Sequence, residues 1–196
     1  MSDDLAVADV LHALAAVLRA RGARWYLFGA QAVMVWGRPR LSGDVDVTAE
    51  VALADARGFA DQMSRAGFQL RITDDIEKFV AETRVLPFVH LASAFPLDVV
   101  LAGSALEDEF LSRAVPVRIG DASVPVMSAE DLIVTKLLAG RAKDLDDVRG
   151  ILRERAARLD LGRIRKLLQL LQQALTRSDL LTQFEAELLS HGGEGH

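Results

Sequence analysis

The first 126 residues alternate between strand-like and helix-like hydrophobic patterns. Short bulky or alternating runs predict strands, and apolar residues at helical spacing predict helices between them. The expected strands are 25–28, 44–48, 68–72, 85–91, 97–101, 115–119 and 123–126, and the expected helices are 4–20, 30–36, 51–65, 74–82 and 104–114. This interleaving is typical of an α/β fold, in which helices flank a mixed β-sheet.

Beyond Ser128 the pattern is helical almost throughout. Ser128 is expected to cap the first of the helices 129–139, 144–157, 160–176 and 178–190. We therefore expect a core domain at 1–126, a helical part packed on it at 127–190, and a disordered tail at 191–196. The apolar stripe in the third of these helices is either a face that packs on its own domain or a dimer seam; it consists of Leu161, Ile164, Leu168, Leu171 and Leu175.

Composition narrows the class of protein. Hydrophobic residues make up 51% and charged residues 26% of the 196 residues, which excludes a disordered chain. The absence of cysteine excludes disulfide scaffolds and thiolate metal sites. The chain has no long apolar run and no basic segment at its start, so we expect a cytoplasmic protein without a signal peptide or membrane contact.

The charge is distributed unevenly along the chain. The net charge is −5, but residues 141–177 carry ten basic and five acidic side chains. This segment is either a solvated helical face or a surface that meets a polyanion such as RNA.

Two aspartates in one expected strand are the most informative chemical feature. Asp44 and Asp46 are separated by one residue, so in a strand both side chains point to the same face. Adjacent carboxylates repel each other unless a cation or a shared proton lies between them, and Mg²⁺ prefers oxygen ligands. An Asp-x-Asp pair alone also occurs on exposed strand edges.

Two further features give this pair a context. Gly29 and Ala30 form a small-residue turn between a strand and a helix, where backbone N–H groups can cradle phosphates or simply connect the two elements. Asp98 stands in an otherwise apolar strand and needs a partner. That partner is either an arginine in a core ion pair or a metal shared with the other aspartates.

This order of motifs resembles the nucleotidyltransferase superfamily of DNA polymerase beta type. The family pattern has a hydrophobic-Gly-Gly/Ser turn, an Asp-x-Asp/Glu strand and a later carboxylate, matched here by Phe28–Ala30, Asp44 with Asp46, and Asp98. The chain also looks like the minimal, abortive-infection toxin-type group. That match consists of Gly37, Arg40, Ser42, Asp44 and Asp46, followed by Lys136, Arg141, Lys143, Asp144 and Asp147.

The resemblance implies a Mg²⁺-dependent enzyme that transfers a nucleoside monophosphate from ATP or another NTP to an acceptor hydroxyl. Asp44, Asp46 and Asp98 would hold two Mg²⁺ ions, with Mn²⁺ as a substitute, and would carry the catalysis. The expected acceptor is a tRNA or other RNA end or a protein, as for a toxin with an antitoxin partner. The residues expected to bind nucleotide are Gly29, Ala30, Arg40, Ser42, Lys136, Lys143 and Asp144.

Some of these positions also have a plainer interpretation. Lys136 can lay its methylenes on the core, Lys143 can be a surface residue, and Asp144 can cap a helix. Arg40 can neutralise the aspartate pair instead of contacting a phosphate. Ala30 departs from the family's Gly or Ser. It leaves open a weak or inactive nucleotide- or partner-binding module, and an antibiotic nucleotidyltransferase with the same aspartate pair is a further alternative.

Overall fold

A computed structural model describes residues 3–38, 42–72 and 75–192. The chain divides into two compact units, and each is described by itself. The first is formed by residues 1–31 and 41–127, and the second by residues 32–40 and 128–196.

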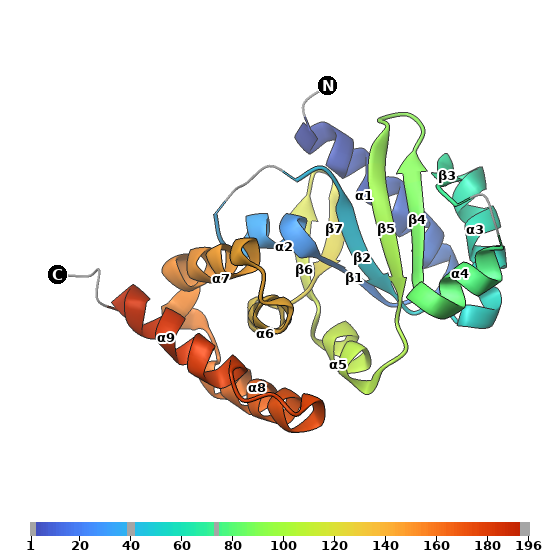
Figure 1. Ribbon diagram of the computed structural model, residues 1–196. Helices are drawn as coiled ribbons and strands as arrows, with labels where there is room; N and C mark the ends of the chain where they lie inside the picture. Colours follow the sequence, from blue (N-terminus) through green and yellow to red (C-terminus); the bar gives the residue numbers. More distant parts are fainter. Residues whose placement is uncertain (1–2, 39–41, 73–74, 193–196) are drawn as a thin grey trace. The chain divides into compact units, whose positions relative to one another are not determined.

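A seven-stranded mixed sheet forms the centre of the first unit (Figure 1). The strand order is β3-β4-β5-β2-β1-β7-β6. Strands β2 and β5 pair in parallel, as do β1 and β7, and the other neighbours are antiparallel. The strands are β1 Trp25–Phe28, β2 Val45–Ala49, β3 Phe68–Leu70, β4 Val85–His90, β5 Phe95–Leu101, β6 Val115–Ile119 and β7 Ala122–Val126. The expected α/β fold with a mixed sheet is confirmed.

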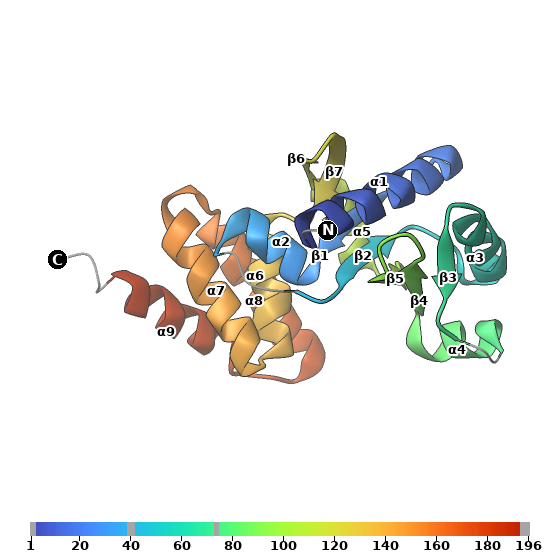
Figure 2. The ribbon, with the colours of Figure 1, turned by 90° about the horizontal axis from the view of Figure 1, so that it is seen from above.

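Helices cover the sheet of this unit. Helix α1 (Asp3–Arg21) packs against β5 and β7, and Figure 2 shows it crossing the sheet. Helix α3 (Ala56–Arg65) packs against the edge strand β3, and α4 (Ile76–Thr83) packs against the neighbouring strand β4. Helix α5 (Ala105–Arg113) begins with a capping box, in which Ser104 and Glu107 satisfy each other's backbone N–H groups.

Some boundaries differ from the sequence expectation. Strand β2 begins at Val45, so Asp44 lies just before it. Strand β5 begins at Phe95 rather than at residue 97, because the turn before it closes through Ala94 in the left-handed conformation (φ 56°). The expected helix 51–65 starts later, after a short 3₁₀ turn at Leu53–Asp55, and α3 follows it.

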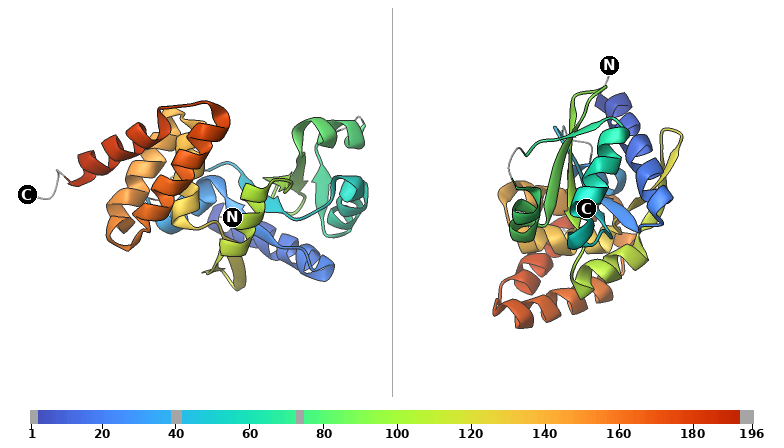
Figure 3. Two further views of the ribbon diagram at one scale, coloured as in Figure 1. Left: turned by 90° about the horizontal axis from the view of Figure 1, so that it is seen from below. Right: turned by 90° about the vertical axis from the view of Figure 1, so that its right-hand side faces the viewer.

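The second unit is helical. Helix α2 (Gly29–Trp36) spans the boundary between the residues of the first unit and those of the second. Four helices follow Ser128: α6 (Ala129–Ala139), α7 (Ala142–Arg155), α8 (Leu161–Leu175) and α9 (Leu180–Gly192). A 3₁₀ turn at Ala156–Arg158 follows α7. The expected cap is confirmed, because the Ser128 hydroxyl accepts from the Asp131 N–H at 3.1 Å. Helices α8 and α9 run side by side (Figure 3).

The apolar face of α8 packs within this unit. Ile164, Leu167 and Leu168 are buried, whereas Leu175 at the end of the expected stripe is exposed. Helix α9 includes residues 191 and 192, and residues 193–196 of the expected tail lie outside the described part. In the described part of the chain, no helix is both long and apolar enough to cross a membrane.

Candidate functional site

Asp46 and Asp98 stand directly opposite each other on the parallel strands β2 and β5. Both strands bury their odd-numbered residues, including Val45, Val47 and Leu97, and leave the two aspartates half-buried on the other face. Directly paired residues of neighbouring strands share a face. Parallel pairing thus brings together two carboxylates that are 52 positions apart in the sequence.

Asp44 lies one residue before β2 and is exposed. The Ser42 hydroxyl lies 3.0 Å from its Oδ1 atom and 3.1 Å from its carbonyl oxygen, to which the buried Gln31 side chain also donates at 3.4 Å. Ser42 therefore orients the first aspartate of the pair. Its expected contact with nucleotide stays a prediction.

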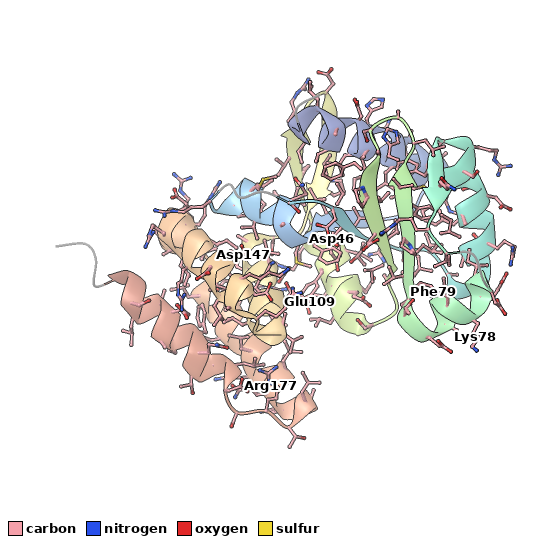
Figure 4. All side chains as sticks on the ribbon, turned by 45° about the horizontal axis from the view of Figure 1, so that its top comes forward. Asp46, Lys78, Phe79, Glu109, Asp147 and Arg177 are labelled. Carbon is pink, nitrogen blue, oxygen red and sulfur yellow. The ribbon has the colours of Figure 1, made fainter. Side chains whose placement is uncertain are left out.

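Gly29 begins α2 in a conformation that the Asp46 carboxylate requires. It has a φ of +67°, and a Cβ atom there would lie 2.1 Å from Oδ2 of Asp46. Any side chain at this position would collide with the carboxylate, which lies on β2 where α2 begins (Figure 4). The structure thus gives Gly29 a role beside Asp46, and the expected phosphate cradle at Gly29 and Ala30 stays a prediction.

Asp98 forms an ion pair with Arg71, which follows strand β3. The expected alternative of an arginine partner is present, but the pair does not lie in the core, because the Asp98 side chain is 34% exposed. Within the described residues, no group of three or more acidic or histidine side chains is arranged to hold a metal. The shared metal site of Asp44, Asp46 and Asp98 stays a prediction.

In the second unit, Lys136 is the centre of a buried ion cluster. Its ammonium donates to Asp144 at 3.1 Å and to Asp147 at 2.7 Å, and all three residues are buried. Lys136 thus neither extends into water nor stands open to a ligand in this structure. It joins α6 to α7, and its expected role in binding nucleotide stays a prediction.

Asp144 does not cap a helix, because α7 begins two residues earlier with Arg141 at its N-cap position. Burial raises the pKa of Asp144, but hydrogen bonds from Arg141 and Lys136 outweigh it and hold the pKa below its usual range. The Arg141 guanidinium donates to both carboxylate oxygens, at 2.5 and 3.1 Å. Asp144 is therefore an ionised residue of the buried cluster.

Of the remaining residues expected to bind nucleotide, the structure describes Lys143 and Ala30. Lys143 is exposed on the first turn of α7, as its plainer interpretation predicted. Arg40 lies outside the described residues. Ala30 is buried at the start of α2.

Arg71 was not among the residues that the sequence singled out. Its partner Asp98 required a cation, but no signal in the chain distinguishes Arg71 from the other arginines. Asp147 was quoted only as part of a family resemblance, and its contact with Lys136 depends on the packing of α6 against α7. Both contacts arise from tertiary pairing, which local patterns do not encode.

Comparison with models of protein families shows to which family the chain belongs. A model described as "Nucleotidyltransferase of unknown function (DUF6036)" matches residues 64–185, which is more than half of the chain. The chain belongs to this family. The match contains Asp98, Lys136 and Asp144 but begins after Asp44 and Asp46. The resemblance to nucleotidyltransferases is confirmed, and the narrower resemblance to abortive-infection toxin-type members stays a prediction.

Solved structures share the fold at low sequence identity. The solution structure of the antibiotic-resistance factor ANT(2'')-Ia is 17% identical, with 98% of this chain and 100% of that chain covered and a TM-score of 0.55. Its crystal structure in complex with adenylyl-2''-tobramycin is 15% identical, with coverages of 87% and 99% and a TM-score of 0.58.

An antigenic nucleotidyltransferase-like protein from Paracoccidioides brasiliensis is 17% identical, with 94% of each chain covered and a TM-score of 0.57. These likenesses show a nucleotidyltransferase-like fold. No curated protein matches the chain significantly.

Proposed function

We propose that this family member is a Mg²⁺-dependent nucleotidyltransferase that uses Asp44, Asp46 and Asp98. The observation that carries the proposal is the direct register of Asp46 with Asp98 on parallel strands, with Asp44 two residues before Asp46. Two carboxylates so placed repel each other in the absence of a cation. Membership in a nucleotidyltransferase family supports the reaction class.

The donor set fits a hard divalent cation. All three side chains offer carboxylate oxygens, which Mg²⁺ and Mn²⁺ prefer, and each is at least partly accessible to solvent. The glycine at position 29 leaves room for the Asp46 carboxylate. A bound Mg²⁺ would neutralise the triphosphate and lower the pKa of the acceptor hydroxyl.

The reaction forms a bond from the acceptor oxygen to the α-phosphorus and breaks the bond from that phosphorus to the bridging oxygen. Pyrophosphate leaves with the electron pair of the broken bond. The acceptor hydroxyl gives up its proton, for which the Asp98 carboxylate is our candidate base. The backbone N–H groups at the start of α2 are the candidate donors to the terminal phosphates. Lys143 and Arg40 remain proposed nucleotide contacts, whereas the proposed contacts of Lys136 and Asp144 require their buried ion cluster to open.

The test is a transfer assay with labelled NTP, Mg²⁺ and candidate acceptors. Asp44→Asn and Asp46→Asn are each expected to lose at least about 100-fold in activity while keeping the wild-type melting temperature. Asp121→Asn is the control, because its side chain is 99% exposed on the turn between β6 and β7. Full activity in both test variants would refute the proposal.

The acceptor class is open between an RNA end, a protein hydroxyl and a small molecule. The excess of basic residues in 141–177 supports RNA, and an RNA or protein acceptor would suit the toxin of a toxin–antitoxin pair. ANT(2'')-Ia, described with adenylyl-2''-tobramycin, shares only the fold. Binding to RNA that falls steeply with rising salt would favour RNA, and the lack of such a slope would disfavour it.

Ala30 supports a second candidate, a nucleotide-binding module without turnover. The family pattern has Gly or Ser at this position, and alanine supplies no hydroxyl to the phosphates. Calorimetric titration with NTP and Mg²⁺ followed by the transfer assay distinguishes the candidates. Binding without product formation would favour the module.

A further inference from the structure

Arg71 reaches Asp98 across an intervening strand. Its backbone N–H donates to the Pro87 carbonyl oxygen at 2.8 Å, and Pro87 on β4 stands directly opposite Asp98 on β5. Strand spacing places the Arg71 backbone about 10 Å from that of Asp98, a span that suits a long side chain. The residues that stand opposite one another on successive neighbouring strands are therefore, in order, Arg71, Pro87, Asp98 and Asp46.

The ion pair occupies one oxygen of the carboxylate that a cation would share. The Arg71 guanidinium donates to Oδ1 of Asp98, and the two side chains are 41% and 34% exposed. Solvent already hydrates a carboxylate of this exposure, so burial does not force the pairing. Asp46, one strand away on the same face, supplies a stronger reason, because the positive charge of Arg71 offsets the repulsion between the two aspartates.

We propose that Arg71 is a positioning residue that holds Asp98 in the cation-free protein and competes with a divalent cation for its carboxylate. The inference rests on the proposed function, since it requires a cation at the aspartates. Guanidinium and cation both neutralise the charge of the same carboxylate, so binding of one weakens binding of the other. A partly exposed ion pair is weak enough for this exchange to be reversible.

The experiment is a Mn²⁺ titration of the full chain, in which free Mn²⁺ is followed by its electron paramagnetic resonance signal. Arg71→Gln removes the competing charge, and Arg71→Lys keeps it. Arg57→Gln is the matched control, because Arg57 forms an exposed ion pair with Glu77 at 2.6 and 2.7 Å and its loss changes the net charge equally. Melting temperatures check that each variant is folded.

We expect Arg71→Gln to bind Mn²⁺ roughly three- to tenfold more tightly than Arg57→Gln, as loss of an exposed ion pair and of a nearby positive charge implies. Arg71→Lys is expected to stay near the wild type. In the wild type, addition of Mg²⁺ is expected to speed hydrogen exchange of the Arg71 Nη–H groups in nuclear magnetic resonance spectra, because the guanidinium is released to water.

Two results would overturn the inference, and they are distinguishable. If Asp46→Asn loses Mn²⁺ binding but Arg71→Gln binds no more tightly than Arg57→Gln, Arg71 does not compete and the proposed function stands. If Asp46→Asn binds Mn²⁺ as the wild type does, or if no form of the chain binds it, both the inference and the proposed function fail.

Discussion

At the scale of single residues, the backbone conformation of Gly29 is linked to the position of the Asp46 carboxylate, one of the proposed Mg²⁺ ligands. The positive φ of Gly29 is a conformation that other residues adopt at a cost of about 1 kcal/mol or more. The Asp46 carboxylate also occupies the space that a Cβ atom would need. A substitution here therefore has two separable effects.

Gly29→Ala is expected to lower the free energy of unfolding by about 2 kcal/mol or more and to weaken Mn²⁺ binding, because the methyl group displaces Asp46. Gly22→Ala is the matched control: Gly22 has a φ of +65° but nothing within 4 Å of its would-be Cβ. Gly22→Ala should lower the free energy of unfolding only by the cost of the left-handed conformation, about 1 kcal/mol, and leave Mn²⁺ binding unchanged. Urea unfolding and Mn²⁺ titration measure the two effects, and equal effects of both substitutions would contradict the role of the collision.

The sequence predicted the aspartates but not the residues that hold them. Period-two alternation put Asp44 and Asp46 on one face, and the single charge in an apolar strand marked Asp98. The choice of Arg71 as its partner depends on β3 pairing with β4 and β4 with β5. Sheet order is a long-range property, so the pattern within each strand does not contain it.

At the scale of elements, the Lys136 cluster fastens α6 to α7. Lys136→Met is expected to lower the free energy of unfolding by about 3 kcal/mol or more, because it leaves the buried carboxylates of Asp144 and Asp147 without their shared ammonium. Lys143→Met, at an exposed position of α7, should change it by less than about 0.5 kcal/mol. Chemical denaturation measures both. Similar small effects in the two variants would show that the cluster does not stabilise the unit.

The same cluster predicts a dependence of stability on pH. The pKa of Asp144 is lower in the folded protein than in the unfolded chain, so its ionised form favours folding above the unfolded value of 3.8. This contribution is lost as the pH falls through the lower folded value. The difference in urea midpoint between wild type and Asp144→Asn should therefore be largest near neutral pH and shrink below about pH 4.

Asp121→Asn, at an almost fully exposed position, is the control for the loss of an ordinary surface carboxylate. A difference between wild type and Asp144→Asn that stays constant down to pH 2 would contradict the ionised state assigned to Asp144.

Element boundaries were less predictable than element types. Asp144 was expected to cap a helix because it precedes an apolar stripe, but α7 extends two residues further and encloses it. Inside the helix, Asp144 accepts hydrogen bonds from Arg141 and Lys136 instead of capping the helix. The sequence shows where the apolar periodicity of a helix begins. Which residue takes the N-cap position depends also on the hydrogen bonds and ion pairs that the polar side chains form in the folded unit.

At the scale of the whole molecule, the two compact units are not consecutive in the chain. The chain passes between them after residues 31, 40 and 127. The change from mixed strand and helix patterns to helical patterns alone predicted a single boundary near residue 126. Residues 32–38 are mostly apolar, so their sequence fits either part. Their assignment to the second unit follows from contacts with α7: Gly37 packs against Ile151, and Arg155 stacks on Trp36 with its guanidinium carbon 5.3 Å from the ring centroid.

Truncation after Met127 tests this division. The fragment 1–127 keeps the seven strands found in the described residues but loses Ile151 and Arg155, the partners of Gly37 and Trp36 in the second unit. Trp36 should therefore be quenched more strongly by iodide in the fragment than in the full chain, while Trp25, only 8% exposed on β1, should be quenched equally in both. Because the chain has just these two tryptophans, Trp36→Phe and Trp25→Phe variants assign the fluorescence. Equal quenching of Trp36 in fragment and full chain would mean that residues 32–38 do not depend on the C-terminal helices.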